Sequence, residues 1–212
     1  MCYRLINLPN AVNRREAKRG GMRGYFAIGV EGVTKPMNVG SLFRSAHAFH
    51  ASFVFTVAAA YPRPLGGQAD TSNAEGQIPF YSFPTLDDLV LPRGCVLVGV
   101  ELLDQATDLP SFHHPRQAAY VFGPERGSLS PALVDRCAHL IAIPTRFALN
   151  VGIAGAIVMY DRLISLGRFA RRPQWPGGRA EPLPEPVFGD PRLRRRVESF
   201  RDRPPTPGAE KP

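Results

Sequence analysis

The stretch VFGPERGSLS, Val121–Ser130, joins the end of an apolar run to a glycine-rich turn and the start of a helix. The run Ala118–Gly123 is apolar enough to form a buried strand. Ser130 followed by Pro131 is a typical beginning for a helix, which we expect over Pro131–Cys137. A strand that leads through a short loop into a helix is the repeating unit of a parallel α/β sheet. The stretch therefore indicates the fold class.

The same succession of apolar strands and helices extends to both sides of this stretch. Upstream, the strand Tyr25–Glu31 precedes a helix over Asn38–Phe49 that has Asn38 as its expected N-cap. Downstream, the strand His139–Ile143 precedes the longest helix, Val151–Leu166. Because the strands are apolar throughout, we expect an α/β fold with a mostly parallel sheet and helices on both faces. The other predicted elements are strands over Ser52–Val57, Ile78–Phe83 and Cys95–Glu101, a loop over Pro62–Asn73 and a short helix over Thr85–Leu91.

The positive charge of the chain is concentrated at its two ends. The 212 residues carry a formal charge of +8 and suit one compact domain with extensions. Residues 1–24 hold six Lys or Arg against one acid, residues 168–212 hold eleven against six, and residues 25–167 hold nine against eleven. Residues 168–212 also hold 10 of the 22 prolines, which disfavour helices and strands. We therefore expect a basic mobile N-terminal arm over 1–24, a folded domain over 25–167 and a Pro/Arg-rich C-terminal tail over 168–212. The basic ends either contact RNA phosphates or stay solvated and aid solubility.

The sequence holds no pattern for a membrane span, a disulfide framework or a metal site. No apolar run reaches the ~18 residues of a membrane helix, and the N-terminus lacks a secretion signal, so we expect a cytoplasmic protein. The cysteines Cys2, Cys95 and Cys137 form no paired framework. His47 and His50 have helical spacing without an evident third ligand, so we expect no bound metal.

Polar residues stand at three predicted strand ends, in segments that also contain glycines. Asn38 and Arg44 follow the first strand, Glu125 follows the strand Ala118–Gly123, and Asn150 follows the last strand. Because ligands collect beyond the carboxyl ends of parallel strands, these segments predict one composite site. Each residue also has a purely structural interpretation. Glu125 suits an exposed turn, Asn150 an ordinary N-cap and Arg44 a surface ion pair.

Taken together, the segments resemble the signature motifs of the SpoU (TrmH) family of RNA ribose 2′-O-methyltransferases, in the SPOUT superfamily. The resemblance keeps the order and spacing of the motifs and covers roughly residues 25–166. The first motif of the family is similar to Asn38-Val39-Gly40 with Arg44-Ser45-Ala46. The second is similar to Phe122-Gly123-Pro124-Glu125-Arg126-Gly127 with Leu129-Ser130. The third is similar to Ile143-Pro144 with Leu149-Asn150-Val151.

This resemblance implies a C-terminal trefoil knot, a homodimer, S-adenosyl-L-methionine as cofactor and an RNA substrate, with tRNA favoured over rRNA because no appended RNA-binding domain is evident. It implies that Arg44 is catalytic and that Asn38, Glu125 and Asn150 shape the site. A guanidinium stays protonated in proteins and is a poor base, so we expect Arg44 to hold phosphate and orient the hydroxyl. The implied cofactor-binding positions are Val100, Glu101, Gly123, Gly127, Ile143, Ala148 and Leu149.

Two positions depart from the pattern of the family. Ala148 stands where the family often has serine, and His50 stands where it commonly has glycine. The missing hydroxyl at Ala148 leaves open a knotted RNA-binding factor that has lost turnover. A second alternative, a Rossmann-type nucleotide-binding enzyme, is less consistent with the sequence. Its glycines should follow the first strand, whereas the glycines at 20, 21 and 24 precede Tyr25–Glu31.

Overall fold

The computed structural model describes residues 24–59, 78–124, 127–167, 169–180 and 182. The chain divides into two compact units, residues 1–169 and 170–212, and every helix and strand described below belongs to the first. The described residues of the second unit, 170–180 and 182, hold no helix or strand. The predicted loop Pro62–Asn73, residues 1–23 of the predicted arm and most of the predicted tail lie outside the described residues.

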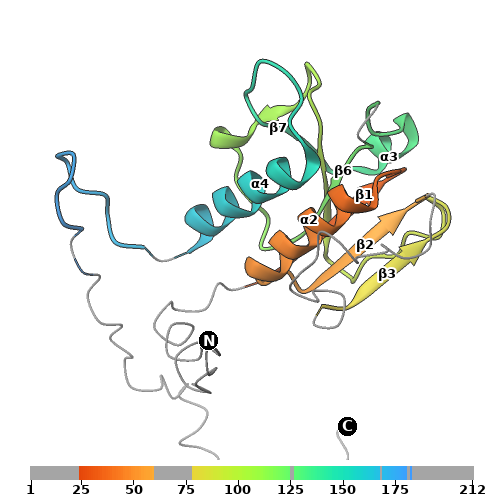
Figure 1. Cartoon of the computed structure of the whole chain (residues 1–212), viewed down its shortest axis with the longest axis horizontal. Helices are drawn as coiled ribbons and strands as arrows, with labels where there is room; N and C mark the ends of the chain where they lie inside the picture. The colour runs from red at the N-terminus through yellow and green to blue at the C-terminus, as the bar shows by residue number, and fades with distance from the viewer. Residues whose placement is uncertain (1–23, 60–77, 125–126, 168, 181, 183–212) are drawn as a thin grey trace, which may run out of the picture. The chain divides into compact units, whose positions relative to one another are not determined.

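A parallel sheet of seven strands forms the centre of the first unit (Figure 1). Its spatial order is β3-β2-β1-β6-β4-β7-β5, and every neighbouring pair runs parallel. This arrangement confirms the predicted parallel α/β class, whereas the trefoil knot stays a prediction. The strands are β1 (Tyr25–Glu31), β2 (Phe53–Val57), β3 (Phe80–Phe83), β4 (Val96–Val100), β5 (Thr107–Asp108), β6 (Gln117–Phe122) and β7 (His139–Ala142).

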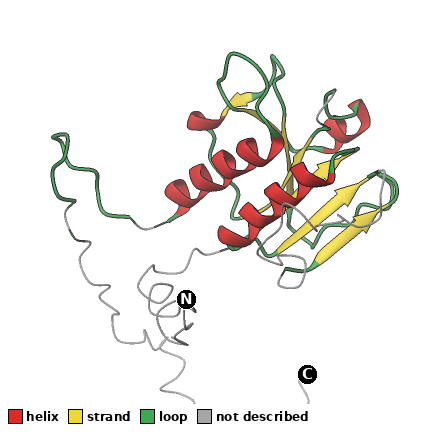
Figure 2. Ribbon diagram, in the orientation of Figure 1, coloured by secondary structure: helices red, strands yellow, loops and turns green. Residues whose placement is uncertain are grey.

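Helices cover both faces of this sheet, as predicted. On one face, α2 and α4 lie side by side and cover Ile28 and Tyr120 (Figure 2). On the other face, Leu133 of α3 packs with Ala27 and Val121. The two apolar clusters contain alternate residues of the same strands because successive side chains of a strand point to opposite faces. The helices are α2 (Pro36–Ala48), α3 (Pro131–Arg136) and α4 (Val151–Leu166), with a 3₁₀ helix, η2, over Leu109–Ser111.

Two glycines of α4 allow it to pack closely against α2. A Cβ atom added at Gly155 would lie 2.0 Å from Leu42 Cδ1, and one added at Gly152 would lie 2.8 Å from Ser41 Oγ. Glycine in a helix interior costs about 1 kcal/mol relative to alanine. The close packing of α4 on α2 offsets this cost, and it brings the first turns of the two helices together.

Two predictions of local structure are wrong. The helix α2 begins at Pro36, so Lys35 takes the N-cap position and Asn38 lies inside the first turn. Proline is favoured at the first helical position, where its missing N–H costs nothing, and this preference displaces the start from Asn38. The predicted helix over Thr85–Leu91 is a turn. There, the Asp88 carboxylate accepts hydrogen bonds from the Thr85 amide and hydroxyl, which replaces helical pairing.

A buried arginine anchors α4 to the edge of the sheet where the strands begin. Arg162 is 2% exposed and donates hydrogen bonds to the carbonyls of Tyr25, Pro115 and Arg116. Its guanidinium also donates to the Tyr120 hydroxyl, at 3.2 Å. These partners belong to segments far apart in the sequence, so Arg162 fixes the end of α4 opposite to Gly152.

Candidate functional site

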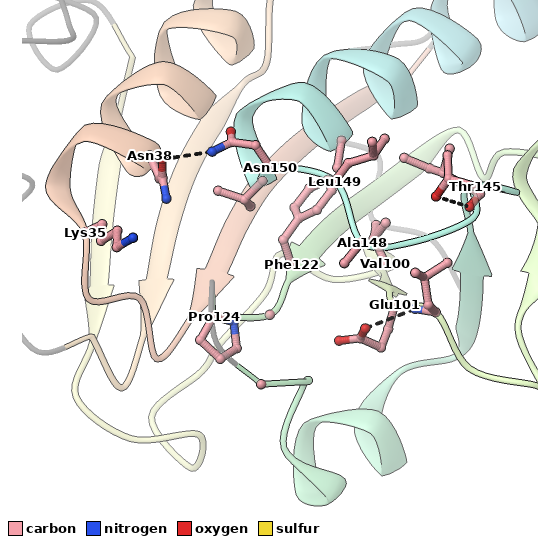
Figure 3. Close-up of a pocket in the computed structure, with 16 residues that line it drawn as sticks. Lys35, Asn38, Val100, Glu101, Phe122, Pro124, Thr145, Ala148, Leu149 and Asn150 are labelled. Atoms are coloured by element: carbon pink, nitrogen blue, oxygen red, sulfur yellow. Dashed lines mark hydrogen bonds between the residues drawn. The ribbon is translucent and has the colours of Figure 1, made fainter.

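A cavity of about 340 Å³ lies at the edge of the sheet where the strands end (Figure 3). The strands β4, β6 and β7 each lead directly into its wall, and the first turns of α2 and α4 complete it. Such a crevice is the usual ligand site of an open parallel sheet. The lining residues are Lys35, Asn38, Val100, Glu101, Leu102, Phe122, Gly123, Pro124, Gly127, Ile143, Thr145, Ala148, Leu149, Asn150, Val151 and Ala154.

A pair of asparagines joins α2 to α4 at one side of this cavity. The Asn150 side chain donates through Nδ2 to Asn38 Oδ1 at 3.0 Å, across 112 residues of sequence. Its own Oδ1 accepts from the Gly152 amide at 2.9 Å, which is the N-cap bond of α4. Asn150 is therefore the predicted N-cap, and it also lines the cavity. Its role in the site stays a prediction.

Two carboxylates hold the segment that follows the glycine turn after β6. Glu101 Oε2 accepts from the Leu129 amide at 3.0 Å. Glu31, at the end of β1, accepts from the Ser130 amide at 2.7 Å and from the Ser130 hydroxyl at 2.5 Å. A Cβ atom added at Gly123 would lie 3.0 Å from the Leu129 nitrogen, so this tight approach requires glycine. The segment is thereby fixed against two strands of the sheet.

The loop between β7 and α4 brings small and apolar residues to the cavity. The Thr145 amide donates to the Ile143 carbonyl at 2.7 Å, and its hydroxyl donates to the Phe147 carbonyl at 2.9 Å. These bonds make a tight turn, after which Ala148 and Leu149 line the cavity. Ala148 contributes only a methyl group at the position where a serine would offer a hydroxyl.

The family of the chain follows from comparison with known proteins. The family model described as SpoU rRNA Methylase family matches residues 25–160, which is most of the chain. The chain belongs to the SpoU methylase family. Among curated proteins, none matches it significantly.

Solved structures with the same fold include several RNA methyltransferases. An AdoMet-bound rRNA methyltransferase from Sinorhizobium meliloti has a TM-score of 0.61 and 22% identity over 68% of this chain and 57% of its own. The SpoU methyltransferase AviRb from Streptomyces viridochromogenes has a TM-score of 0.59 and 20% identity over 70% of this chain and 62% of its own. The TrmH/SpoU tRNA modifying enzyme of A. aeolicus has a TM-score of 0.58 and 17% identity over 73% and 81%. The chain thus spans about three fifths of the length of the first two structures.

The cavity of this SpoU-family protein brings together most of the predicted site residues. Asn38 and Asn150 line it, and the role predicted for each stays a prediction. Glu125 lies outside the described residues. The positions predicted to bind the cofactor all line the same cavity: Val100, Glu101, Gly123, Gly127, Ile143, Ala148 and Leu149.

Arg44 does not line the cavity. It is exposed on α2, six residues after Asn38. At about 100° per residue, the neighbouring Leu42, Phe43 and Ala46 turn toward the sheet while Arg44 turns away from it. Its predicted catalytic role is therefore not explained by the cavity of a single chain.

Sequence reasoning missed two charged residues of this region. Lys35 lines the cavity from the N-cap position of α2, and its proximity to Asn38 in the sequence was the available signal. Glu31 is 8% exposed, although an acid at the end of a predicted strand suggests a solvated position. The available signal was its place at the end of a fully apolar strand, which favours a buried carboxylate. A buried carboxylate needs hydrogen-bond donors nearby, so this signal also indicated a structural role.

The described residues offer neither a metal centre nor a membrane span. No cluster of three or more His, Cys, Asp or Glu residues in that part of the chain is arranged to hold a metal ion. Within the same residues, no helix has both the length and the apolar character to cross a membrane.

Proposed function

We propose that this SpoU-family protein transfers a methyl group from S-adenosyl-L-methionine to the ribose 2′-hydroxyl of an RNA nucleotide. The observation that supports this most is the single cavity at which all three motif segments meet. Family membership supports RNA methylation, and the similar rRNA methyltransferase from S. meliloti binds AdoMet.

The cavity residues fit this cofactor. Val100, Phe122 and Leu149 form apolar walls suited to a purine ring, and the cavity of about 340 Å³ is in the size range of small-molecule sites. Gly123 and Gly127 let backbone approach a ligand closely. When bound, the cofactor supplies a methyl group made electrophilic by its sulfonium.

The acceptor hydroxyl needs to lie in line with that methyl group, so positioning dominates the catalysis. The bond between Asn38 and Asn150 fixes two side-chain amides at the cavity wall, where they can orient a ribose. Arg44 holds a phosphate of the RNA with its permanent charge and does not remove the proton. The role that the family resemblance implies for Glu125 stays a prediction, because this residue lies outside the described residues.

We further propose a homodimer formed through α4. Four apolar side chains, Ile153, Ile157, Tyr160 and Ile164, are between 36% and 56% exposed and follow one face of this helix. An apolar stripe of this kind marks an interface rather than a solvated surface. In this proposed dimer, Arg44, which is exposed on the neighbouring helix α2, acts at the cavity of the partner subunit.

Of the two RNA classes, we propose tRNA. The A. aeolicus tRNA modifying enzyme is matched over 81% of its length. A protein whose structure concerns 2-OH methylation of C/U34 on tRNA is matched over 97% of its length, with a TM-score of 0.56 and 18% identity. The S. meliloti rRNA methyltransferase is matched over only 57%. The match over most of the length of these two tRNA-related proteins favours the tRNA class.

Incubation with tritiated cofactor and separate pools of tRNA and rRNA tests this function. We expect label in tRNA, and mass spectrometry of the digested RNA should find a 2′-O-methylnucleoside. Label on a base would refute the ribose specificity, and label in rRNA alone would refute the tRNA class. Cofactor binding without transfer to any RNA would favour the alternative, an RNA-binding factor without turnover, which the missing hydroxyl at Ala148 keeps open.

A further inference from the structure

The cavity contains one acidic side chain among its described lining residues. Glu101 follows the last residue of β4 and stands across the cavity from Asn38 and Asn150 (Figure 3). The walls beside it are apolar. A carboxylate at the border of such a cavity is stable only when hydrogen-bond donors surround it.

Backbone amides fix the orientation of this carboxylate. Oε1 accepts from the Leu102 amide and Oε2 accepts from the Leu129 amide, each at 3.0 Å. An ionised carboxylate accepts about four hydrogen bonds, two on each oxygen. Glu101 therefore presents two oxygens side by side, each with capacity for one further donor.

The geometry points to Glu101 as the residue that binds the ribose of S-adenosyl-L-methionine, with its two oxygens accepting from the 2′- and 3′-hydroxyls. This assignment rests on the proposed function. A cis-diol offers two neighbouring O–H donors, which match the two fixed acceptors. An acidic residue just beyond a strand end commonly binds a ribose in this way in other nucleotide sites.

The methionine end of the cofactor is the weaker match. Its ammonium and carboxylate share one carbon, so a glutamate that attracts the first also repels the second. The ribose hydroxyls are uncharged donors, and a charge-assisted hydrogen bond to each is stronger than one between neutral groups.

Glu31 provides a matched control for the structural role of Glu101. It accepts from the Ser130 amide and hydroxyl, one residue beyond the Leu129 amide that Glu101 holds. Glu31 is buried and is absent from the cavity wall. A substitution at Glu31 therefore loosens the same segment without removing a cavity acceptor.

Calorimetry with two nucleosides separates these roles. The probes are 5′-methylthioadenosine and its 2′,3′-dideoxy analogue, measured with the wild-type chain, Glu101→Gln and Glu31→Gln. In the wild type, we expect the diol to strengthen binding by at least about tenfold. The ratio of the affinity for 5′-methylthioadenosine to the affinity for its dideoxy analogue should fall toward one in Glu101→Gln. The ratio should persist in Glu31→Gln, even where this variant binds both nucleosides more weakly.

Three results would overturn the assignment. One is a wild-type ratio near one, which needs no variant and so stands even where Glu101→Gln does not fold. Another is an unchanged ratio in Glu101→Gln. The third is a Glu101→Gln variant that binds S-adenosylhomocysteine more weakly but binds 5′-methylthioadenosine with unchanged affinity. This result would mean that the Glu101 carboxylate contacts the methionine end of the cofactor. Failure of the wild type to bind S-adenosylhomocysteine at all would instead refute the proposed function.

Discussion

Replacing Asn150 by serine separates its structural role from its proposed role in positioning the substrate. Asn150 caps α4 through the Gly152 amide and also donates to Asn38. Serine is about as good an N-cap as asparagine, but its hydroxyl is too short to keep the bond to Asn38. Asn150→Ser therefore removes the contact between the two helices and leaves the cap in place.

The structure gives the size of each effect. Loss of an N-cap costs about 1 kcal/mol, so Asn150→Ala should lower the free energy of unfolding by about that amount. The exposed bond to Asn38 adds little, and Asn150→Ser should stay within about 0.5 kcal/mol of the wild type. Misplacement of a reactant by 1 Å costs about 100-fold in rate, so methyl transfer by Asn150→Ser should fall by about tenfold to 100-fold.

Urea unfolding and initial rates of methyl transfer measure the two effects on the same samples. Asn38→Ala is the matched control because it removes the same bond from the side of α2 and leaves the cap of α4 intact. It should reproduce the loss of activity at nearly unchanged stability. Wild-type rates in both Asn150→Ser and Asn38→Ala would refute the reasoning that this pair positions the ribose.

Four further perturbations test other parts of the structure. Gly155→Ala places a Cβ atom 2.0 Å from Leu42 Cδ1. The cost of overpacking should exceed the gain in helix propensity, so the unfolding free energy should fall by up to about 2 kcal/mol. A variant that is more stable than the wild type in urea unfolding would contradict this. Burial lowers the pKa of His114, so the unfolded chain binds more protons below about pH 6.5 and stability should fall as the pH drops from there. Urea unfolding at several pH values should give a flatter profile for His114→Gln, and an equal slope would rule out His114 as the cause. Ile157→Glu places a charge in the exposed stripe of α4 and should convert the dimer to monomers in sedimentation, with loss of methyl transfer; an unchanged dimer would exclude the stripe as the interface. Arg44→Ala should keep the dimer and lose most methyl transfer, and unchanged transfer would remove Arg44 from the mechanism.

Helices and strands were predictable from the sequence where their apolar pattern and capping residues match the burial seen in the structure. The bounds of Tyr25–Glu31 and Val151–Leu166 match the structure residue for residue. Ser130 and Asn150 cap their helices as expected, because an N-cap bond depends only on residues two or three positions away. The glycine turns after the strands likewise predicted where the cavity lies.

Features that depend on distant residues were not predictable. An arginine in the last part of a helix suggests a solvated side chain, yet Arg162 is buried because carbonyls 46 and 47 residues earlier accept its hydrogen bonds. The role of Glu31 depends on Ser130, 99 residues away. In the proposed dimer, the position of Arg44 relative to the partner's cavity depends on a second chain, which no local pattern describes.

Hydrogen exchange with and without S-adenosylhomocysteine tests most directly whether segments far apart in the sequence form one cofactor site. We predict slower exchange of backbone amides in three separate segments, residues 100–103, 127–130 and 145–152, because the ligand contacts all of them at once. Residues 115–117, at the opposite edge of the sheet, should be unaffected. Protection confined to one segment, or centred on residues 115–117, would contradict a shared cavity and the function proposed from it.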